Sequence, residues 1–302
     1  MNIVSKGIDI SRWQGDFNMD KAVAEGFSFA IIKAGGGDDG MYKDSRFEKN
    51  YENAKRLGIP VGAYWFSKAL TVEQARAEAD WFASCLTVKQ FELPVYMDVE
   101  HRAMLDLGKR KLTDIIHAFC QRMEELGYWV GIYSSQSFFS TYMIDSELQR
   151  YAHWVACWGT SCSYQGDCFG MWQYGGETNK IRSNKVAGVV CDQNYMLIDY
   201  PALIKARGLN GFQKAEESDS DTGTYVPITV DLPVLRKGDT GDTVRALQTL
   251  LIGLGYSCGA AGADGAFGDD TENAVMALQE DAELPGRDGI VGGMEWHILM
   301  GL

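Results

Sequence analysis

Short apolar segments recur along the chain up to about residue 212, and segments with helical spacing separate them. The apolar segments have the length and residue types of buried β-strands. The intervening segments, such as 71–86 and 111–127, place apolar residues at i, i+3 and i+4, as amphipathic helices do. About eight strands that alternate with helices predict a closed α/β barrel. The eight segments are SKGIDIS, SFAIIKA, PVGAYWFS, PVYMDVE, YWVGIYSS, HWVACW, GMWQYG and AGVVCDQNYM.

A polar stretch ends this pattern. Residues 211–233, GFQKAEESDSDTGTYVPITVDLP, are acidic and rich in Ser, Thr, Asp and Gly, which is the composition of an exposed linker. We therefore predict a barrel domain over residues 1–212, a linker over 213–231 and a second domain over 232–302.

Charge argues against some classes of partner. The 302 residues hold 28 Lys and Arg against 41 Asp and Glu, and residues 213–302 hold only 5 against 16. A nucleic-acid partner is not expected, because binding it requires cations that neutralise phosphates. Membrane insertion is not expected either, since no apolar run approaches the ~20 residues that span a bilayer. The first residues, MNIVSKGIDIS, lack the pattern of a secretory signal, so we expect synthesis in the cytoplasm.

Cysteines and histidines show no metal-binding pattern. The seven cysteines contain no CxxC pair, and the four histidines form no HxH or HxxxH pair. We therefore expect no metal, no cofactor and mostly buried thiols. A bridge between Cys162 and Cys168 in an oxidising medium is the alternative.

The segment PVYMDVE, residues 94–100, places two acids at the end of a strand. Strand side chains alternate between faces, so Asp98 and Glu100 point the same way. Their mutual repulsion raises at least one pKa. Capping of a following helix would explain one acid, but it gains nothing from a second in the preceding strand. The pair therefore indicates a catalytic role.

Other acids and aromatic rings also fall at the ends of predicted strands, where barrel enzymes place their reactive groups. Aromatic faces stack on sugar rings, and paired acids cleave glycosidic bonds, so this set predicts a sugar cleft. For any single aromatic residue, packing inside the barrel is the alternative. The candidates are the acids Asp9, Asp98, Glu100 and Asp192, and the aromatic residues Tyr64, Tyr133, Trp158, Trp172 and Tyr174.

Five motifs in a fixed order carry a resemblance to a known family. GIDISRWQG, YMDVE, GIYSS, WQYG and VVCDQNYM resemble the family-25 glycoside hydrolases, which are lysozymes (N-acetylmuramidases) of bacteria and phages. The resemblance covers about the first 210 residues. It implies an irregular, TIM-like β/α barrel whose acidic groove binds bacterial peptidoglycan. It also implies that Asp9, Asp98, Glu100 and Asp192 are the catalytic acids.

Chemistry then suggests a role for each acid. The glycan carries a 2-acetamido group whose oxygen can attack the anomeric carbon, with net retention. We expect Glu100 to act as general acid and then base, Asp98 to stabilise the acetamido group, and Asp9 and Asp192 to position the sugar. In the competing arrangement, Asp98 or Asp192 is itself the nucleophile.

The C-terminal part predicts a strand-poor unit of three helices. One helix follows the turn at 239–242, another starts near Thr271, and the pattern Asp-Gly-x-x-Gly occurs twice before a helix. The unit resembles the peptidoglycan-binding domain of wall hydrolases. A calcium site at Asp264, Asp269 and Asp270 is an alternative, although the spacing does not make a D-x-D-x-D-G loop.

These features favour a peptidoglycan muramidase with a wall-binding module. A wall-binding protein without turnover is the alternative, but it would have no reason to keep Asp98 and Glu100. A chitinase-like barrel would need an acid two residues before Asp98, where this chain has Tyr96. Synthesis without a signal suggests a phage-type endolysin that reaches the wall through a lysis pore. A bacterial autolysin exported by another non-Sec route is the alternative.

Overall fold

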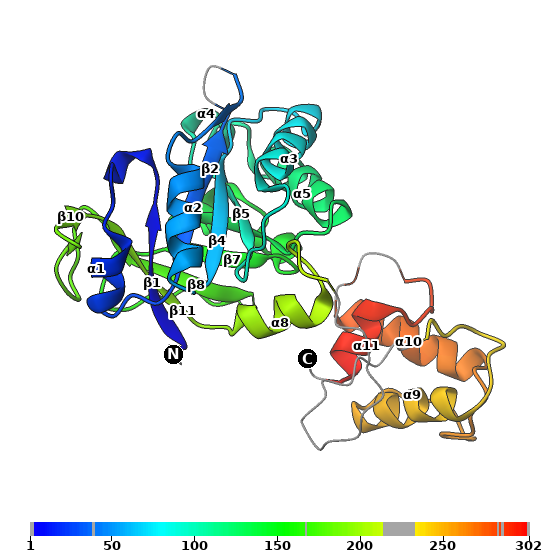
Figure 1. Ribbon diagram of the computed structural model, residues 1–302. Coiled ribbons are helices and arrows are strands. Elements are labelled where there is room, and N and C mark those ends of the chain that lie inside the picture. The colour runs from blue at the N-terminus through cyan, green and yellow to red at the C-terminus, as the bar shows by residue number, and fades with distance from the viewer. Residues whose placement is uncertain are drawn as a thin grey trace. The chain divides into compact units, whose positions relative to one another are not determined.

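The computed structural model describes residues 3–37, 40–166, 168–213, 233–282, 284 and 287–300. Contacts divide the chain into two compact units, residues 1–221 and 222–302 (Figure 1). The predicted linker, 213–231, lies outside the described residues except for its first residue. Among the helices of the described ranges, none combines the length and the apolar character needed to cross a bilayer.

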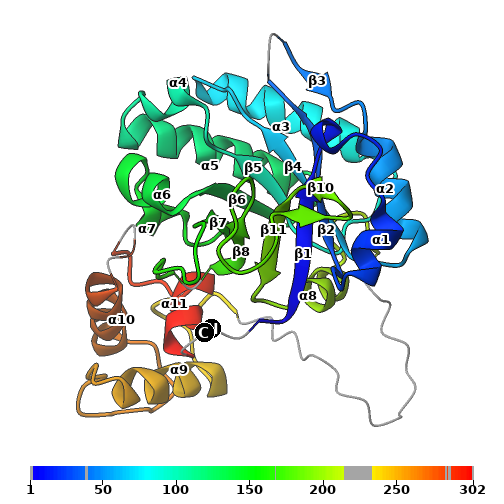
Figure 2. The same cartoon turned by 90° about the vertical axis from the view of Figure 1, so that its left-hand side faces the viewer.

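Eight strands form a closed barrel in the first unit (Figure 2). They are β1 (Ser5–Ile10), β2 (Ala30–Gly36), β4 (Val61–Phe66), β5 (Val95–Asp98), β6 (Val130–Ser135), β7 (Ala152–Ala156), β8 (Phe169–Gly175) and β11 (Asp192–Met196). Their order is β1-β11-β8-β7-β6-β5-β4-β2, and pairing of β1 with β2 closes the ring. Each predicted segment overlaps one of these strands, so the predicted barrel is confirmed.

Strand direction makes the barrel irregular. β11 runs antiparallel to both neighbours, β8 and β1, whereas the other barrel pairs are parallel. The first residue of β11 therefore lies at the same end of the barrel as the last residues of the other seven strands. A short strand, β3 (Tyr42–Lys43), adds to the edge of β2.

Helices cover the outer face of the barrel. Alternate strand residues such as Ile32 and Met97 pack outward against them, while Ile31 and Tyr96 belong to a separate interior cluster. α8 (Tyr200–Arg207) adds Tyr200 and Ile204 to that interior cluster. The outer helices are α1 (Met19–Ala24), α2 (Phe47–Arg56), α3 (Val72–Leu86), α4 (Arg102–Leu105), α5 (Lys109–Glu125), α6 (Gln136–Tyr142) and α7 (Asp145–Leu148). Smaller elements are the turn η1 (Arg12–Gln14) and the hairpin of β9 (Lys185–Val186) and β10 (Val189–Val190).

The predicted helices 71–86 and 111–127 are confirmed as α3 and α5. The Thr71 hydroxyl caps α3 by accepting a hydrogen bond from the backbone N–H of Gln74, and the helix then buries Ala75, Ala79 and Phe82 on one face. The connection from β7 to β8 differs, because its described residues, 157–166 and 168, form no helix.

The second unit holds α9 (Asp242–Gly253), α10 (Asp269–Asp281) and α11 (Gly293–Leu299) around one small core. Half of this core comes from apolar residues of α9 and α10, which pack together with Phe267 and Trp296: Val244, Leu247, Leu251, Ala274, Val275 and Leu278. The three helices confirm the predicted class of this unit.

A buried glutamine explains each Asp-Gly turn of this unit. Gln248 of α9 donates to Asp264 Oδ1 (2.9 Å) and accepts from the N–H of Gly265 (2.7 Å). Gln279 of α10 repeats both contacts with Asp288 (2.9 Å) and Gly289 (3.0 Å). Both glycines have positive φ, which a side chain would strain.

These contacts do not support the calcium alternative at Asp264, Asp269 and Asp270. Asp264 is engaged with Gln248 and with the N–H of Ala266, and Asp269 pairs with Lys237. Within the described parts of the chain, no three His, Cys, Asp or Glu side chains are grouped to hold a metal ion.

Candidate active site

Four carboxylates meet at one end of the barrel. Asp9 and Asp98 lie near the ends of β1 and β5, and Glu100 follows β5 by two residues. Asp192 begins the antiparallel strand β11 and is the direct register partner of Asp9. Directly opposite residues of an antiparallel pair have Cβ atoms about 5 Å apart. The four acids that were predicted from separate motifs therefore form one group.

Burial sets the electrostatics of this group. It raises the pKa of Asp192 to about 8 and that of Asp9 to about 6, with the charge of Glu100 adding to both shifts. Burial, and then the charge of Glu100, raises the pKa of Asp98 well above its ordinary value. Asp98 and Asp9 are only 3% and 6% exposed. Asp192 therefore keeps at neutral pH a proton that an exposed aspartate would have lost.

Glu100 is the accessible member of the group. Its side chain is exposed at the rim, whereas Asp9 and Asp98 are buried. Even so, its carboxylate lies deep enough among the rim side chains for burial to raise its pKa, and the cation of Lys33 opposes that shift. An accessible carboxyl group with a raised pKa is suited to proton transfer to a ligand.

Amide side chains hold Asp9 in place. Asn194 Nδ2 and Gln173 Nε2 donate to Asp9 Oδ2 at 2.8 and 3.1 Å. Gln173 Oε1 in turn accepts hydrogen bonds from the Tyr133 hydroxyl and from Trp158 Nε1, both at 3.0 Å. A single glutamine thus joins a catalytic candidate to two aromatic candidates.

Asp98 contrasts with Asp9 in its hydrogen bonding. Among the described residues, its buried Oδ1 atom has no hydrogen-bond partner. An unmatched buried carboxylate oxygen is costly, and such atoms are found where a ligand supplies the missing partner.

Three predicted aromatic residues do join the acids. Burial and the charges of Asp9 and Asp98 raise the pKa of Tyr64, while burial and the charge of Glu100 raise that of Tyr133. Trp158 is 41% exposed. A Cβ atom on Gly176 would lie 2.1 Å from Asp192 Oδ1 and 2.5 Å from the Trp158 ring, so glycine is required where these two side chains meet.

Trp172 and Tyr174 do not join them, which corrects the prediction for both. They alternate along β8 with Gln173, which faces Asp9, so they project from the opposite, outer face of the strand. There they pack against Tyr195, with ring centroids 5.7 and 4.2 Å away, and the Tyr174 hydroxyl donates to Gln193 Oε1. Both residues are packing residues of the outer barrel wall.

Comparison with known proteins places this arrangement in a family. Residues 8–182 match the model of Glycosyl hydrolases family 25, and this range contains three of the four acids. The chain belongs to glycosyl hydrolase family 25. Residues 240–299 match the model of a peptidoglycan binding domain, which covers the three-helix unit.

Relatives agree with this family-25 assignment. Lysozyme M1 of Streptomyces globisporus is 34% identical over 202 residues, which are 61% of this chain and 68% of that protein. The crystal structure of the bacterial lysozyme from Streptomyces coelicolor is 30% identical with a TM-score of 0.56, covering 70% of this chain and 98% of that one. The CTP1L endolysin structure is 25% identical with a TM-score of 0.57, covering 67% and 70%.

Three residues of the family-25 site were missed by reasoning from the sequence. Lys33 reaches the carboxylates from β2 and lies 5.7 Å from the Tyr64 ring centroid. The sequence feature that pointed to Lys33 was a single cationic residue in the apolar segment SFAIIKA. Gln173 gave a weaker signal, because one polar residue in a mostly apolar strand also occurs at structural positions. Asn194 follows two other polar residues, Asp192 and Gln193, so its residue type did not single it out.

The predicted alternative of a Cys162–Cys168 bridge is wrong for this structure. Cys162 Sγ contacts Gln136 Oε1 at 3.5 Å and the thiol of Cys157, while Cys168 Sγ lies 2.7 Å from His153 Nδ1. The two sulfur atoms therefore face different partners, and all seven cysteines are thiols.

Proposed function

We propose that this chain is a cell-wall lysozyme that hydrolyses the β-1,4 bond between N-acetylmuramic acid and N-acetylglucosamine in bacterial peptidoglycan. The main observation in support of this proposal is the group of four carboxylates at one end of a family-25 barrel. Glu100 is accessible, and Asp9, Asp98 and Asp192 lie around it. The peptidoglycan-binding unit of the same chain supports the same substrate.

Glu100 acts as the general acid. Its raised pKa keeps a proton on the carboxyl group closer to neutral pH than an ordinary glutamate would, and its exposure lets it reach the glycosidic oxygen. After the leaving sugar departs, the same carboxylate accepts a proton from the attacking water.

Asp98 binds the 2-acetamido group of the substrate. Its buried Oδ1 atom, which lacks a partner among the described residues, accepts a hydrogen bond from the acetamido N–H. This contact turns the acetamido oxygen toward the anomeric carbon, where it acts as the nucleophile. The charge of Glu100 adds to the burial that raises the pKa of Asp98, so ionisation of Glu100 disfavours ionisation of Asp98. The cationic cyclic intermediate then favours the ionised form of Asp98.

Asp9 and Asp192 position the sugar, and Asp9, whose pKa is about 6, adds negative charge to the cleft at neutral pH. The amides of Gln173 and Asn194 both hold Asp9 through its Oδ2 atom, so we assign it a positioning role. Asp192 as a direct nucleophile remains the competing mechanism. It would form a covalent glycosyl-enzyme, which substrate assistance does not.

We further propose that the protein is a phage-type endolysin. It would be made in the cytoplasm and reach the wall through a lysis pore. The similarity to an endolysin structure supports this proposal. A bacterial autolysin exported by a non-Sec route is the alternative.

Mass spectrometry of the sugar ends freed from purified peptidoglycan tests the function. After reduction with borohydride, a muramidase leaves reduced muramic acid at the new ends. Reduced glucosamine at those ends would instead mean a glucosaminidase, and no new ends would mean a binding protein without turnover. The Glu100→Gln variant serves as the control for contaminating hydrolases.

A further inference from the structure

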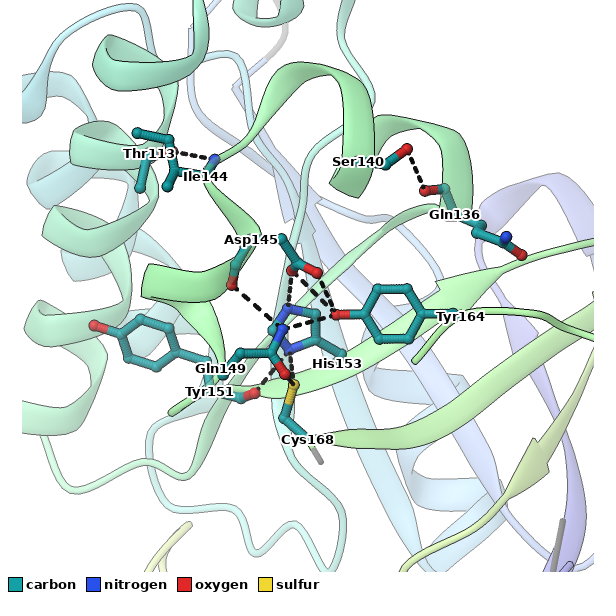
Figure 3. Close-up of polar contacts among 10 residues, drawn as sticks. All are labelled: Thr113, Gln136, Ser140, Ile144, Asp145, Gln149, Tyr151, His153, Tyr164 and Cys168. Atoms are coloured by element: carbon teal, nitrogen blue, oxygen red, sulfur yellow. Dashed lines mark hydrogen bonds and ion pairs between the residues drawn. The ribbon is translucent and has the colours of Figure 1, made fainter. Parts of the chain in front are cut away.

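A second group of reactive side chains lies on the outer face of β7, away from the carboxylates (Figure 3). His153 alternates with Ala152 and Trp154 of the interior cluster, and its own side chain is 0% exposed. Asp145 of α7 and Cys168, which precedes β8, contact its ring. We call His153, Asp145 and Cys168 the thiol cluster.

The thiol cluster has the connectivity of an activated cysteine. Cys168 Sγ lies 2.7 Å from His153 Nδ1, and Asp145 Oδ1 lies 3.2 Å from Nε2 of the same ring. Tyr164 fixes the carboxylate by donating its hydroxyl hydrogen toward Oδ1 (3.0 Å) and Oδ2 (2.8 Å) of Asp145. A nucleophile, a base and a group that orients the base are therefore in hydrogen-bond reach of one another.

A backbone carbonyl group influences whether His153 Nδ1 carries a hydrogen. Tyr151 O is 2.9 Å from His153 Nδ1, the same nitrogen that faces Cys168. If Nδ1 carries only a lone pair, that lone pair faces the lone pairs of a carbonyl oxygen, which is repulsive. If Nδ1 carries the thiol proton, it donates to both the carbonyl oxygen and the sulfur. The carbonyl therefore favours a hydrogen on Nδ1, and the Asp145 carboxylate 3.2 Å from Nε2 favours one on that nitrogen as well. Only the imidazolium donates from both nitrogens, and the Cys168 thiol can supply its second proton.

Proton transfer inside the cluster leaves its net charge unchanged. The Asp145 carboxylate faces the resulting imidazolium through Nε2, so the new cation is paired although it is buried. Gln149 Oε1, 3.1 Å from the sulfur, accepts the thiol hydrogen and is the contact that favours the neutral form. Tyr164 and Tyr200 also feel the charge of Cys168, but burial raises the pKa of both phenols, so they stay neutral.

We propose that Cys168 is a site of covalent modification by soft electrophiles and small-molecule disulfides, with His153 taking up the thiol proton and Asp145 orienting His153. With a disulfide RSSR, a bond forms between Cys168 Sγ and one sulfur, the S–S bond breaks, and the leaving thiolate takes the proton from His153 to become RSH. The side chain of Cys168 is partly exposed, which allows such reagents to reach it.

Cys162 is the matched control in the same β7–β8 connection. It is also partly exposed, but its neighbours are Gln136 and Cys157, with no histidine. Burial, with the Cys157 thiol adding to it, raises the pKa of Cys162 to about 11. Its reaction rate should therefore climb with pH throughout the neutral range, as that of an unactivated thiol does.

The experiment treats the reduced full-length protein with limiting iodoacetamide, and in parallel with oxidised glutathione, between pH 5.5 and 8.5. Peptide mass spectrometry gives the rate at each cysteine. We expect Cys168 to react at least ~10-fold faster than Cys162 at pH 6.5, with a rate that depends little on pH. Equal rates, or a Cys168 rate that rises with pH in parallel with that of Cys162, would overturn the proposal.

The His153→Gln variant tests the assigned base. Glutamine keeps a polar side chain but cannot hold the thiol proton, so Cys168 should lose its advantage and acquire the steep pH dependence of Cys162. An unchanged advantage would overturn the role of His153. If the variant does not fold, Asp145→Asn is the second variant, and the pH comparison in the unmodified protein still decides. None of these readouts depends on lysozyme activity.

Discussion

Glu100 carries the proton that glycosidic cleavage needs. Replacement by glutamine keeps the shape of the side chain but removes the transferable proton, so we expect Glu100→Gln to lower kcat by at least ~10² while folding is unchanged. Release of soluble fragments from labelled peptidoglycan measures the loss. Glu52→Gln, an exposed position on α2, is the control and should keep full activity. Near-normal turnover of Glu100→Gln would remove Glu100 from the mechanism.

Burial of ionisable acids in the active site lowers the free energy of unfolding at neutral and alkaline pH. Because the pKa of Asp192 is raised to about 8 in the folded protein, the folded state holds this proton more tightly than the unfolded chain does. The contribution of Asp192 to stability is then lost as pH rises from the ordinary aspartate range toward 8. Asp192→Asn removes this penalty and should raise the free energy of unfolding at pH 8, relative to pH 4, by at least about 2 kcal/mol.

Denaturant titration at both pH values measures this effect. Tryptophan fluorescence is a suitable probe because all tryptophans except Trp296 belong to the barrel unit. Asp199→Asn is the control for the loss of an exposed carboxylate, because this residue makes no side-chain cap hydrogen bond at α8. If Asp192→Asn changes the free energy of unfolding by the same amount at pH 4 and pH 8, the raised pKa of Asp192 is contradicted.

At the scale of the element, β8 separates two kinds of residue. Gln173 on its inner face serves Asp9, Tyr133 and Trp158, whereas Tyr174 on its outer face packs against Tyr195. Gln173→Met keeps the volume but removes one hydrogen bond from each of these three groups. We expect kcat to fall by at least ~10-fold and stability to fall by about 1–3 kcal/mol.

The outer face of β8 provides the matched control. Tyr174→Phe removes one hydrogen bond, to Gln193, and should change stability slightly while kcat stays the same. Steady-state kinetics on soluble glycan fragments and thermal unfolding of both variants separate the two effects. Equal kcat values for Gln173→Met and Tyr174→Phe would mean that the inner amide network has no part in catalysis.

The same strand shows what sequence can and cannot predict. The strands and the acids at their ends follow from apolar segments and from motifs with two acids at a spacing of two. The orientation of β8 does not, because all residues of GMWQYG are buried and no polar alternation tells the two faces apart. Lys33 and Asn194 were missed for a related reason: their roles depend on which strand lies beside which.

At the scale of the whole molecule, the barrel and the three-helix unit have separate hydrophobic cores. A chain that ends at Asp221 should therefore fold and cleave soluble glycan fragments as the full chain does. Its activity on intact walls should fall, because the binding unit no longer raises the local substrate concentration. An insoluble barrel would show that the two units fold together, and unchanged activity on walls would show that the second unit does not contribute.

The mechanism makes one claim about the whole reaction, namely that the acetamido oxygen of the substrate is the nucleophile. That oxygen closes a ring on one face of the sugar, so water enters from the other face and the configuration is retained. An inverting enzyme would need carboxyl groups roughly 6.5–9.5 Å apart with water between them. Asp98 and Glu100 are two residues apart on one side of the barrel mouth, which does not suit that arrangement.

Proton NMR of the product during the first minutes of hydrolysis, before the anomers equilibrate, tests this claim most directly. The signal of the newly formed reducing end distinguishes the two anomers, and the wild-type protein with soluble peptidoglycan fragments is sufficient. We predict that the β-anomer appears first. The α-anomer as the first product would contradict substrate-assisted retention.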